Sequence, residues 1–137
     1  MTERPVLAVG AYVCHQGKLL VFQRTGKSCP GSWSPAGGHV EFGEHWFDAA
    51  IRVAKEELGV NAHSPELFAI TNDLFADQGK HCITFHVALK ADSFDFANAE
   101  PTKQANLGWY EWNEIPTPRM PGVQAAFDLN KKPPYVN

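Results

Sequence analysis

The chain alternates apolar and polar segments at spacings that predict a sheet and two helices. Residues 6–13 are apolar and mostly small, and residues 18–22 form a second apolar run across a turn that contains Gly17. Alternating or apolar runs predict three further strands, at residues 66–71, 82–89 and 107–112. Residues 25–38 hold four glycines and two prolines, a composition typical of a loop.

The clearest helical pattern lies in residues 45–58, where apolar side chains recur at spacings of three and four. The predicted apolar stripe consists of Phe47, Ala50, Ile51, Ala54 and Leu58. Gly59 follows, at the position where glycine ends many helices, and residues 122–129 predict a short second helix. Strands in mixed order around a central helix predict an α/β fold, with a mixed central sheet between helices as an α/β/α sandwich.

Composition places these elements in one globular domain. The chain has 137 residues, 44% apolar and 20% charged, with a net charge of −3. This length favours a single domain over residues 1–137, and the absence of a basic run argues against nucleic acid polymers as partners. The sequence has no long apolar run, no secretory signal pattern and an odd number of cysteines. We therefore expect a cytoplasmic protein that binds neither nucleic acid polymers nor membranes.

The acidic end of the first helix carries the most informative chemistry. Glu56 and Glu57 are adjacent there, and Arg52 lies one turn before Glu56 on the same face. Carboxylate and carbonyl oxygens are the ligands that Mg²⁺ takes in proteins, and the glycine pair at 37–38 lets bare backbone approach closely. For an isolated pair of glutamates, the solvated end of an amphipathic helix is the simpler interpretation.

The two glutamates are part of a longer pattern of spaced residues, from Gly38 to Val60. Gly38 is followed after five residues by Glu44, and after seven more by Arg52, and the segment ends with Glu56, Glu57, Gly59 and Val60. This pattern resembles the Nudix box of hydrolases that act on nucleoside diphosphates linked to a further group. The resemblance runs from Pro5 to Pro118, and it is greatest to the branch that hydrolyses nucleoside triphosphates to monophosphates.

The resemblance implies a metal site and a substrate site. Mg²⁺, or Mn²⁺ in its place, is expected on the backbone carbonyl of Gly38 and the carboxylates of Glu56, Glu57 and Glu100. Arg52 is expected to orient the glutamates, and Glu44 either to support the site or to favour the positive end of the helix dipole. A small nucleotide is expected to contact Arg24, His39, Gly37 and Gly38, and the protein to form a homodimer.

The sequence also suggests roles for one histidine and for four aromatic residues. His86 alternates with apolar residues and is expected to be a histidine satisfied within the sheet. Aromatic side chains that could stack on a base are Trp33, Trp46, Trp109 and Phe75, although tryptophans in a strand pattern more often belong to the core.

Two positions depart from the box: where the family has an acid after the arginine, this sequence has Val53, and where it has a bulky aliphatic residue next, this sequence has Ala54. The first departure bears on the chemistry. Either the protein is a pyrophosphatase with fewer metal ions, or its chemistry is altered. The main prediction is Mg²⁺-dependent hydrolysis of a pyrophosphate bond in a nucleoside di- or triphosphate or a related nucleotide. The alternatives are a sugar-nucleotide hydrolase of the GDP-mannose type, which attacks at carbon, and a weakened nucleotide-binding module.

Overall fold

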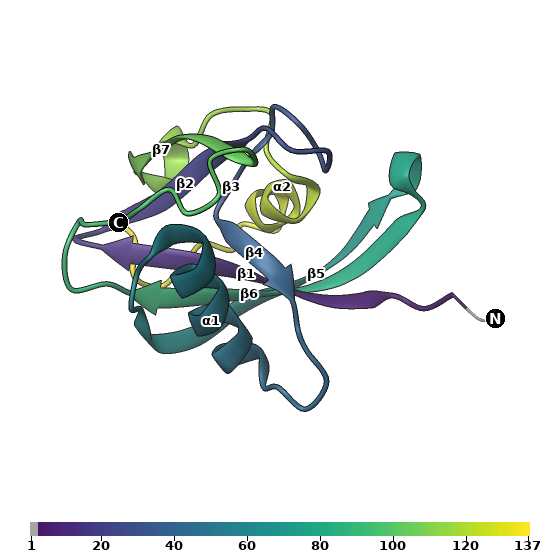
Figure 1. Ribbon diagram of the computed structural model, residues 1–137, viewed down its shortest axis with the longest axis horizontal. Helices are drawn as coiled ribbons and strands as arrows, with labels where there is room; N and C mark the ends of the chain where they lie inside the picture. The colour runs from purple at the N-terminus through teal and green to yellow at the C-terminus, as the bar shows by residue number, and fades with distance from the viewer. Residues whose placement is uncertain (1–2) are drawn as a thin grey trace.

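Within residues 3–137, which the structure describes, the computed structural model has one seven-stranded sheet with a helix on each face (Figure 1). The helices are α1 (Trp46–Leu58) and α2 (Pro121–Asp128), and two short 3₁₀ turns are η1 (Ala76–Gln78) and η2 (Trp112–Glu114). The strands are β1 (Val6–His15), β2 (Lys18–Arg24), β3 (Trp33–Ser34), β4 (Ala36–His39), β5 (His63–Phe75), β6 (Lys80–Lys90) and β7 (Gln104–Tyr110).

The sheet is mixed, and the predicted α/β/α sandwich is confirmed. β1 lies at its centre and pairs in parallel with β6, from Val6 opposite Cys82 to Cys14 opposite Lys90. The other pairings are antiparallel, and the main order is β3-β2-β1-β6-β5. β6 occupies one edge of β1, so the other edge is shared by two strands. β4 pairs near the beginning of β1, and β2 pairs at its end.

α1 covers one face of the sheet through small apolar side chains, which pack against β1, β2 and β6. The predicted apolar stripe faces this core: Phe47 and Ile51 are half-buried and pack against it, and the other three members are buried within it. The helix packs closely on the glycines of β4, and its buried residues are Ala49, Ala50, Val53, Ala54 and Leu58. The helix ends at the expected place, because Gly59 takes the left-handed conformation with φ of 66°.

α2 covers the opposite face and forms a second apolar core with β1 and β2. Trp112 was expected in the last strand, but the strand ends at Tyr110 and Trp112 lies in η2. There its ring stacks on Phe127 of α2, with centroids 4.1 Å apart and planes at 8°. Burial of the indole against α2 outweighs continuation of the strand.

The segment 25–38 is not entirely a loop, contrary to the prediction. β3 pairs with β2, and the four residues of β4 pair with residues 8–11 of β1. Glycine usually weakens a strand, but here its lack of a side chain permits close packing. A Cβ atom on Gly37 would lie 3.1 Å from the carbonyl oxygen of Val9, and one on Gly38 would lie 2.9 Å from Cγ2 of Val53.

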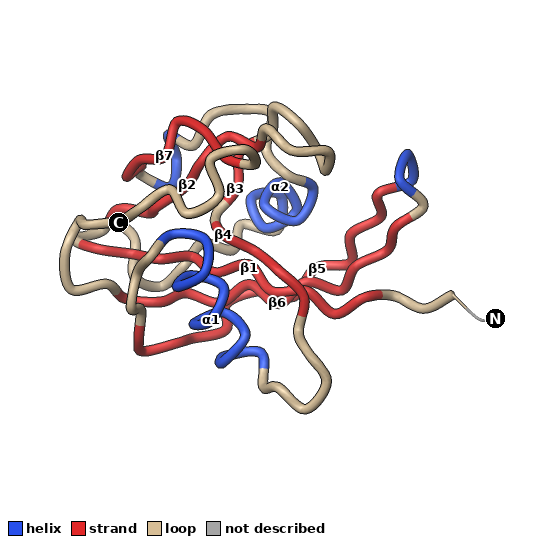
Figure 2. Tube along the Cα trace, viewed as in Figure 1, coloured by secondary structure: helices blue, strands red, loops and turns tan. Residues whose placement is uncertain are grey.

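The ribbon of β5 and β6 projects past the end of α1 and is closed by η1 at its tip (Figures 1 and 2). The prediction ended β5 too early, at Thr71, whereas buried and exposed residues go on alternating to Phe75. Beyond α1, the side of the ribbon that continues the α1 face presents Leu7, Ile70, Leu74 and Ile83, here called the uncovered ribbon face. Among the described helices, none is long and apolar enough to span a membrane.

Candidate active site

Arg52 organises the acidic side chains along the exposed edge of α1. Its Nε and Nη2 atoms donate to the two carboxylate oxygens of Glu44 at 2.9 and 3.0 Å, and Nη1 donates to Glu56 at 3.2 Å. Nη2 also donates to the carbonyl oxygen of His39, 3.0 Å away. The bidentate hydrogen bond lowers the pKa of Glu44 and raises that of Arg52. Arg52 therefore ties the end of β4 and the residue before the helix cap to α1.

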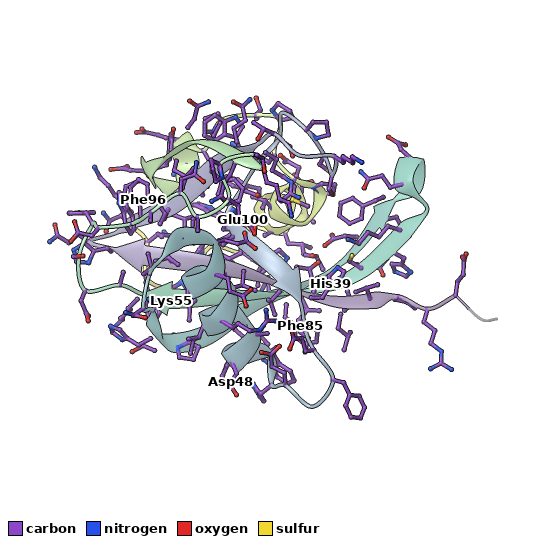
Figure 3. All side chains as sticks on the ribbon, viewed as in Figure 1. His39, Asp48, Lys55, Phe85, Phe96 and Glu100 are labelled. Atoms are coloured by element: carbon purple, nitrogen blue, oxygen red, sulfur yellow. The ribbon has the colours of Figure 1, made fainter. Side chains whose placement is uncertain are left out.

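Glu57 lies near the C-terminal end of α1, and its side chain approaches β4. The Gly37 N–H donates to its Oε1 atom at 3.4 Å. The segment that carries Glu100 is fixed to the end of α1, because the Gln104 side chain and the Ala99 N–H both donate to the Glu57 carbonyl oxygen, at 2.8 and 3.3 Å. Figure 3 shows Glu100 at the end of α1 opposite Asp48. The fold thus brings two distant glutamates to one place.

The environment of Glu57 resists its ionisation. Burial is the main reason that its pKa is raised to about 7, and the charge of Glu100 and then that of Glu56 act in the same direction. The Gly37 N–H and the positive charge of Arg24 oppose these effects. A carboxyl group that titrates near neutral pH beside two further carboxylates is an arrangement common in functional sites.

The oxygen donors suit a hard cation in type. Within residues 3–137, the His, Cys, Asp and Glu side chains form no group of three already placed to hold a metal ion. The three predicted carboxylates, those of Glu56, Glu57 and Glu100, are therefore not already gathered around one position. The fourth predicted donor is a backbone carbonyl, that of Gly38. Repulsion among Glu57, Glu100 and Glu56 is also what a divalent cation would relieve.

A cavity of about 250 Å³ lies on the α2 face of the sheet, beside the glycine pair. The four residues predicted to bind substrate, Arg24, Gly37, Gly38 and His39, all line it. Arg24 is held by a hydrogen bond from Nε to the Ser28 carbonyl oxygen, at 2.9 Å. Of the aromatic residues proposed for stacking, Phe75 alone lines the cavity as the structure describes it, and the three tryptophans pack elsewhere.

The sequence did not predict that polar residues gather on the opposite side of this cavity. They are Tyr12, Thr71, Asp73, Thr84 and His86, here called the polar floor. Four of these residues line the cavity, and Thr71 lies behind them. The hydroxyls of Thr71 and Thr84 donate to Asp73 Oδ2 at 2.9 and 2.7 Å. Only an extension of the alternating pattern past Thr71 could have placed Asp73 on a buried strand face.

The polar floor fixes the state of its histidine. Because the Thr71 hydroxyl donates to Asp73, it accepts from His86 Nε2–H at 2.8 Å, and His86 Nδ1 then accepts from the Tyr12 hydroxyl at 2.8 Å. Burial lowers the pKa of His86 to about 4, so the ring is neutral at physiological pH. His86 is the satisfied sheet histidine that the sequence predicts.

Several known proteins are similar to this chain in sequence and in fold. The NUDIX domain family model matches residues 4–129. The Nudix hydrolase YvcI of Bacillus subtilis is 30% identical over 118 residues, which cover 84% of this chain and 72% of that protein. Nudix hydrolase 2 of Arabidopsis thaliana is 31% identical over 111 residues, or 79% of this chain, but the match spans only 40% of that longer protein.

A solved structure agrees over nearly the whole chain. The crystal structure of a MutT NUDIX hydrolase from Burkholderia pseudomallei superposes with a TM-score of 0.81 at 26% identity, over 92% of this chain and 98% of that one. The family match includes every strand and both helices described above, together with the segment from Gly38 to Val60. The chain therefore belongs to the NUDIX family, whose members are hydrolases of phosphoric anhydrides.

Proposed function

We propose that the chain hydrolyses a pyrophosphate bond in a nucleoside di- or triphosphate, or in a related small nucleotide, with Mg²⁺ as cofactor. The observation that carries this proposal is the meeting of Glu57 with the glycine pair beside a cavity that crosses β4, β1, β6 and β5. Three strand spacings separate the glycines from Asp73, about 14 Å. That span supports a ligand with phosphates at one end and a base at the other.

The residues fit the cofactor by their chemistry. Gly38 would supply its carbonyl oxygen, and Glu56, Glu57 and Glu100 would supply carboxylates, which are the ligand types that Mg²⁺ and Mn²⁺ accept. When bound, the ion would offset charge on the bridging and leaving oxygens and lower the pKa of a water molecule.

The other predicted residues have positioning roles in this proposal. Arg52 would hold Glu56 and, through Glu44, the loop that follows β4. Glu56 would bind the ion or orient the attacking water, while the planar guanidinium of Arg24 would bind phosphate oxygens. His39 lines the cavity at the same end and would contact the substrate there.

Val53 supports keeping a second candidate function, the hydrolysis of a sugar nucleotide by attack at carbon. Its side chain is 1% exposed and packs among the apolar residues of α1, so it supplies no acid beside Gly38. Attack at phosphorus leaves the oxygen of ¹⁸O-water on a phosphate product, whereas attack at carbon leaves it on the sugar. A binding module without turnover would give neither product.

The test is a panel of nucleoside di- and triphosphates and sugar nucleotides with Mg²⁺, scored for phosphate after phosphatase coupling. Glu57→Gln should lower the activity at least a hundredfold, more than the roughly 10–100-fold loss typical of groups behind the ligands. Asp48→Asn makes the same chemical change at an exposed position of α1 and should leave activity unchanged. A Glu57→Gln variant that keeps most of its activity, or label on the sugar, would reject the proposed mechanism.

We also propose that the protein is a cytoplasmic homodimer that assembles through the uncovered ribbon face. Leu7, Ile70 and Leu74 are 48%, 52% and 65% exposed there. The three cysteines are all unpaired, which supports a reducing location.

A further inference from the structure

The polar floor contains a buried carboxylate that is only half satisfied. Asp73 is 3% exposed, and both of its threonine donors reach the same oxygen, Oδ2. Among residues 3–137, no hydrogen bond reaches Oδ1 and no cationic side chain forms an ion pair with Asp73. Oδ1 is not among the fully buried atoms that lack a hydrogen bond, so it remains accessible from the cavity that Asp73 lines, where a ligand can reach it.

The surroundings hold Asp73 in one orientation. Thr71 is itself held by His86, and His86 by Tyr12, so the donors to Oδ2 are fixed from behind. α2 closes the other side: a Cβ atom on Gly122 would lie 2.8 Å from Asp73 Oδ2. The beginning of α2 thus lies beside the carboxylate, where the positive end of the helix dipole offsets part of its charge. These contacts hold the Asp73 carboxylate in place, with its free oxygen at the wall of the cavity.

A second polar group on the cavity wall also lacks a partner. Ser34 lines the cavity and is 2% exposed, and its hydroxyl makes no hydrogen bond within the part of the chain that the structure describes. Phe75 and Met120 add apolar surface for a flat ring. The Ser34 oxygen is itself buried, so the groups that the cavity offers a ligand are an acceptor-only oxygen and apolar walls, as in a site for a heteroaromatic ring.

We propose that Asp73 selects a base of the 2-amino-6-oxopurine (guanine) type, with Oδ1 accepting from the ring N1–H and the 2-amino group. This inference rests on the proposed nucleotide hydrolysis and names the base. A carboxylate only accepts hydrogen bonds, and Oδ1 has two free lone pairs for two adjacent donors. Adenine and cytosine present a ring-nitrogen acceptor beside their amino group, and uracil flanks its single N–H with carbonyl oxygens. Each of those edges brings an acceptor against the carboxylate.

Binding of nucleoside monophosphates without metal tests the base apart from the chemistry. By calorimetry, GMP should bind the wild-type protein about 10- to 100-fold more tightly than IMP, which lacks the 2-amino group, as expected for one hydrogen bond to a charged group. AMP should bind more weakly than GMP by at least the same factor. Equal affinity for GMP and IMP would overturn the inference, and this comparison requires no variant.

Asp73→Asn separates recognition from a structural role. The Thr71 and Thr84 hydroxyls donate, so they should retain the amide oxygen and turn the amide nitrogen toward the cavity. That nitrogen donates and opposes the N1–H, so the preference for GMP over IMP should fall to near one. Asp77→Asn, at an exposed position in η1, should keep the wild-type ratio. A folded Asp73→Asn protein that keeps the full preference would overturn the inference.

The two proposals fail in different ways. Hydrolysis of GTP, ITP and ATP with equal kcat/KM, together with equal binding of the monophosphates, rejects base selection and leaves nucleotide hydrolysis standing. Selective GMP binding without hydrolysis of any member of the panel rejects the proposed hydrolysis and supports the role of Asp73.

Discussion

At the scale of single residues, Glu57 combines two opposing requirements. It is buried beside Glu100 and Glu56, which favours its protonated form, yet it accepts a hydrogen bond from Gly37, which favours the carboxylate. Its pKa of about 7 lies well above the ordinary value of 4.5. The folded protein without metal therefore binds a proton there that the unfolded chain has already released.

That proton links stability to pH with a definite sign. A raised carboxyl pKa contributes stability fully below about pH 4.5, and this contribution is lost as pH rises through about 7. In EDTA, between about pH 5 and about pH 8, the wild type should lose about 3 kcal/mol of unfolding free energy relative to Glu57→Gln. Urea unfolding at each pH measures the difference, in which the opposite effect of buried His86 cancels. Parallel curves for the two proteins would contradict the assignment.

Val53 stands where the Nudix box has an acid, so its place in the structure bears on the chemistry of the candidate site. It is buried in the α1 core, and Cγ2 is the atom nearest to where a Gly38 side chain would begin. A glutamate at this position would start from beneath the glycine whose carbonyl is the proposed metal ligand. The valine therefore occupies the direction from which a further carboxylate could reach the ion.

Val53→Glu should restore that carboxylate at a cost in stability. Without metal, the unfolding free energy should fall by about 1–3 kcal/mol, because an unpaired charge is buried. At saturating Mg²⁺, the rate on the preferred nucleotide should rise, or the Mg²⁺ concentration for half-maximal rate should fall. Val53→Gln has nearly the same shape without the charge and should give only the loss of stability. A folded Val53→Glu protein that loses activity with no change in its metal requirement would favour attack at carbon.

At the scale of elements, the strand β4 shows why two glycines follow one another. Gly37 lies against β1 and Gly38 against α1, and neither has a positive φ, so it is the close approach that excludes a side chain. The same approach brings Glu57 within reach of the Gly37 N–H. The packing of α1 on β4 and the geometry of the candidate site thus share one cause.

Gly38→Ala should therefore disturb both packing and site. Its methyl group would lie 2.9 Å from Cγ2 of Val53, and overpacking of this kind costs about 1–3 kcal/mol. Val53→Ala removes that methyl, so the double variant should be less destabilised than the sum of the two single variants by at least about 0.5 kcal/mol. Chemical unfolding of the four proteins measures this coupling. Additive effects would show that the helix shifts instead of clashing.

Sequence predicted elements best where the determining contacts are local. α1 follows from its own periodicity and from Gly59, and the ion pair of Arg52 with Glu56 follows from their spacing along that helix. β4 was missed because its strand character comes from pairing with β1, which lies far away along the chain. Asp73 was missed for the same reason, since the register of β5 and β6 brings Thr84 and His86 to it.

At the scale of the whole molecule, the two faces of the sheet differ in what lies against the β5–β6 ribbon. The α2 face of the β5–β6 ribbon lines the cavity, whereas the α1 face extends beyond the end of its helix (Figure 1). There Phe85 still stacks on Trp46 of α1, with ring centroids 5.0 Å apart, but Ile70 and Leu74 have no such cover. Asn72 and His81 lie on the same face and are joined by a hydrogen bond, so exposed apolar and polar side chains alternate there. Exposed apolar side chains gathered on one face are typical of an interface.

The proposed homodimer makes a prediction at this scale. Sedimentation across a tenfold range of concentration should give about twice the 15.2 kDa mass of one chain. Leu74→Lys places a charge on the uncovered ribbon face, near the tip of the ribbon, and should shift the mass toward that of the monomer. Phe42→Lys makes the same kind of change at a fully exposed apolar residue of the loop before α1, outside this face, and should leave the dimer intact. A wild-type mass near 15.2 kDa throughout the range would reject the dimer. Equal dissociation by both variants would place the interface elsewhere, because a charge on the loop would then matter as much as one on the ribbon.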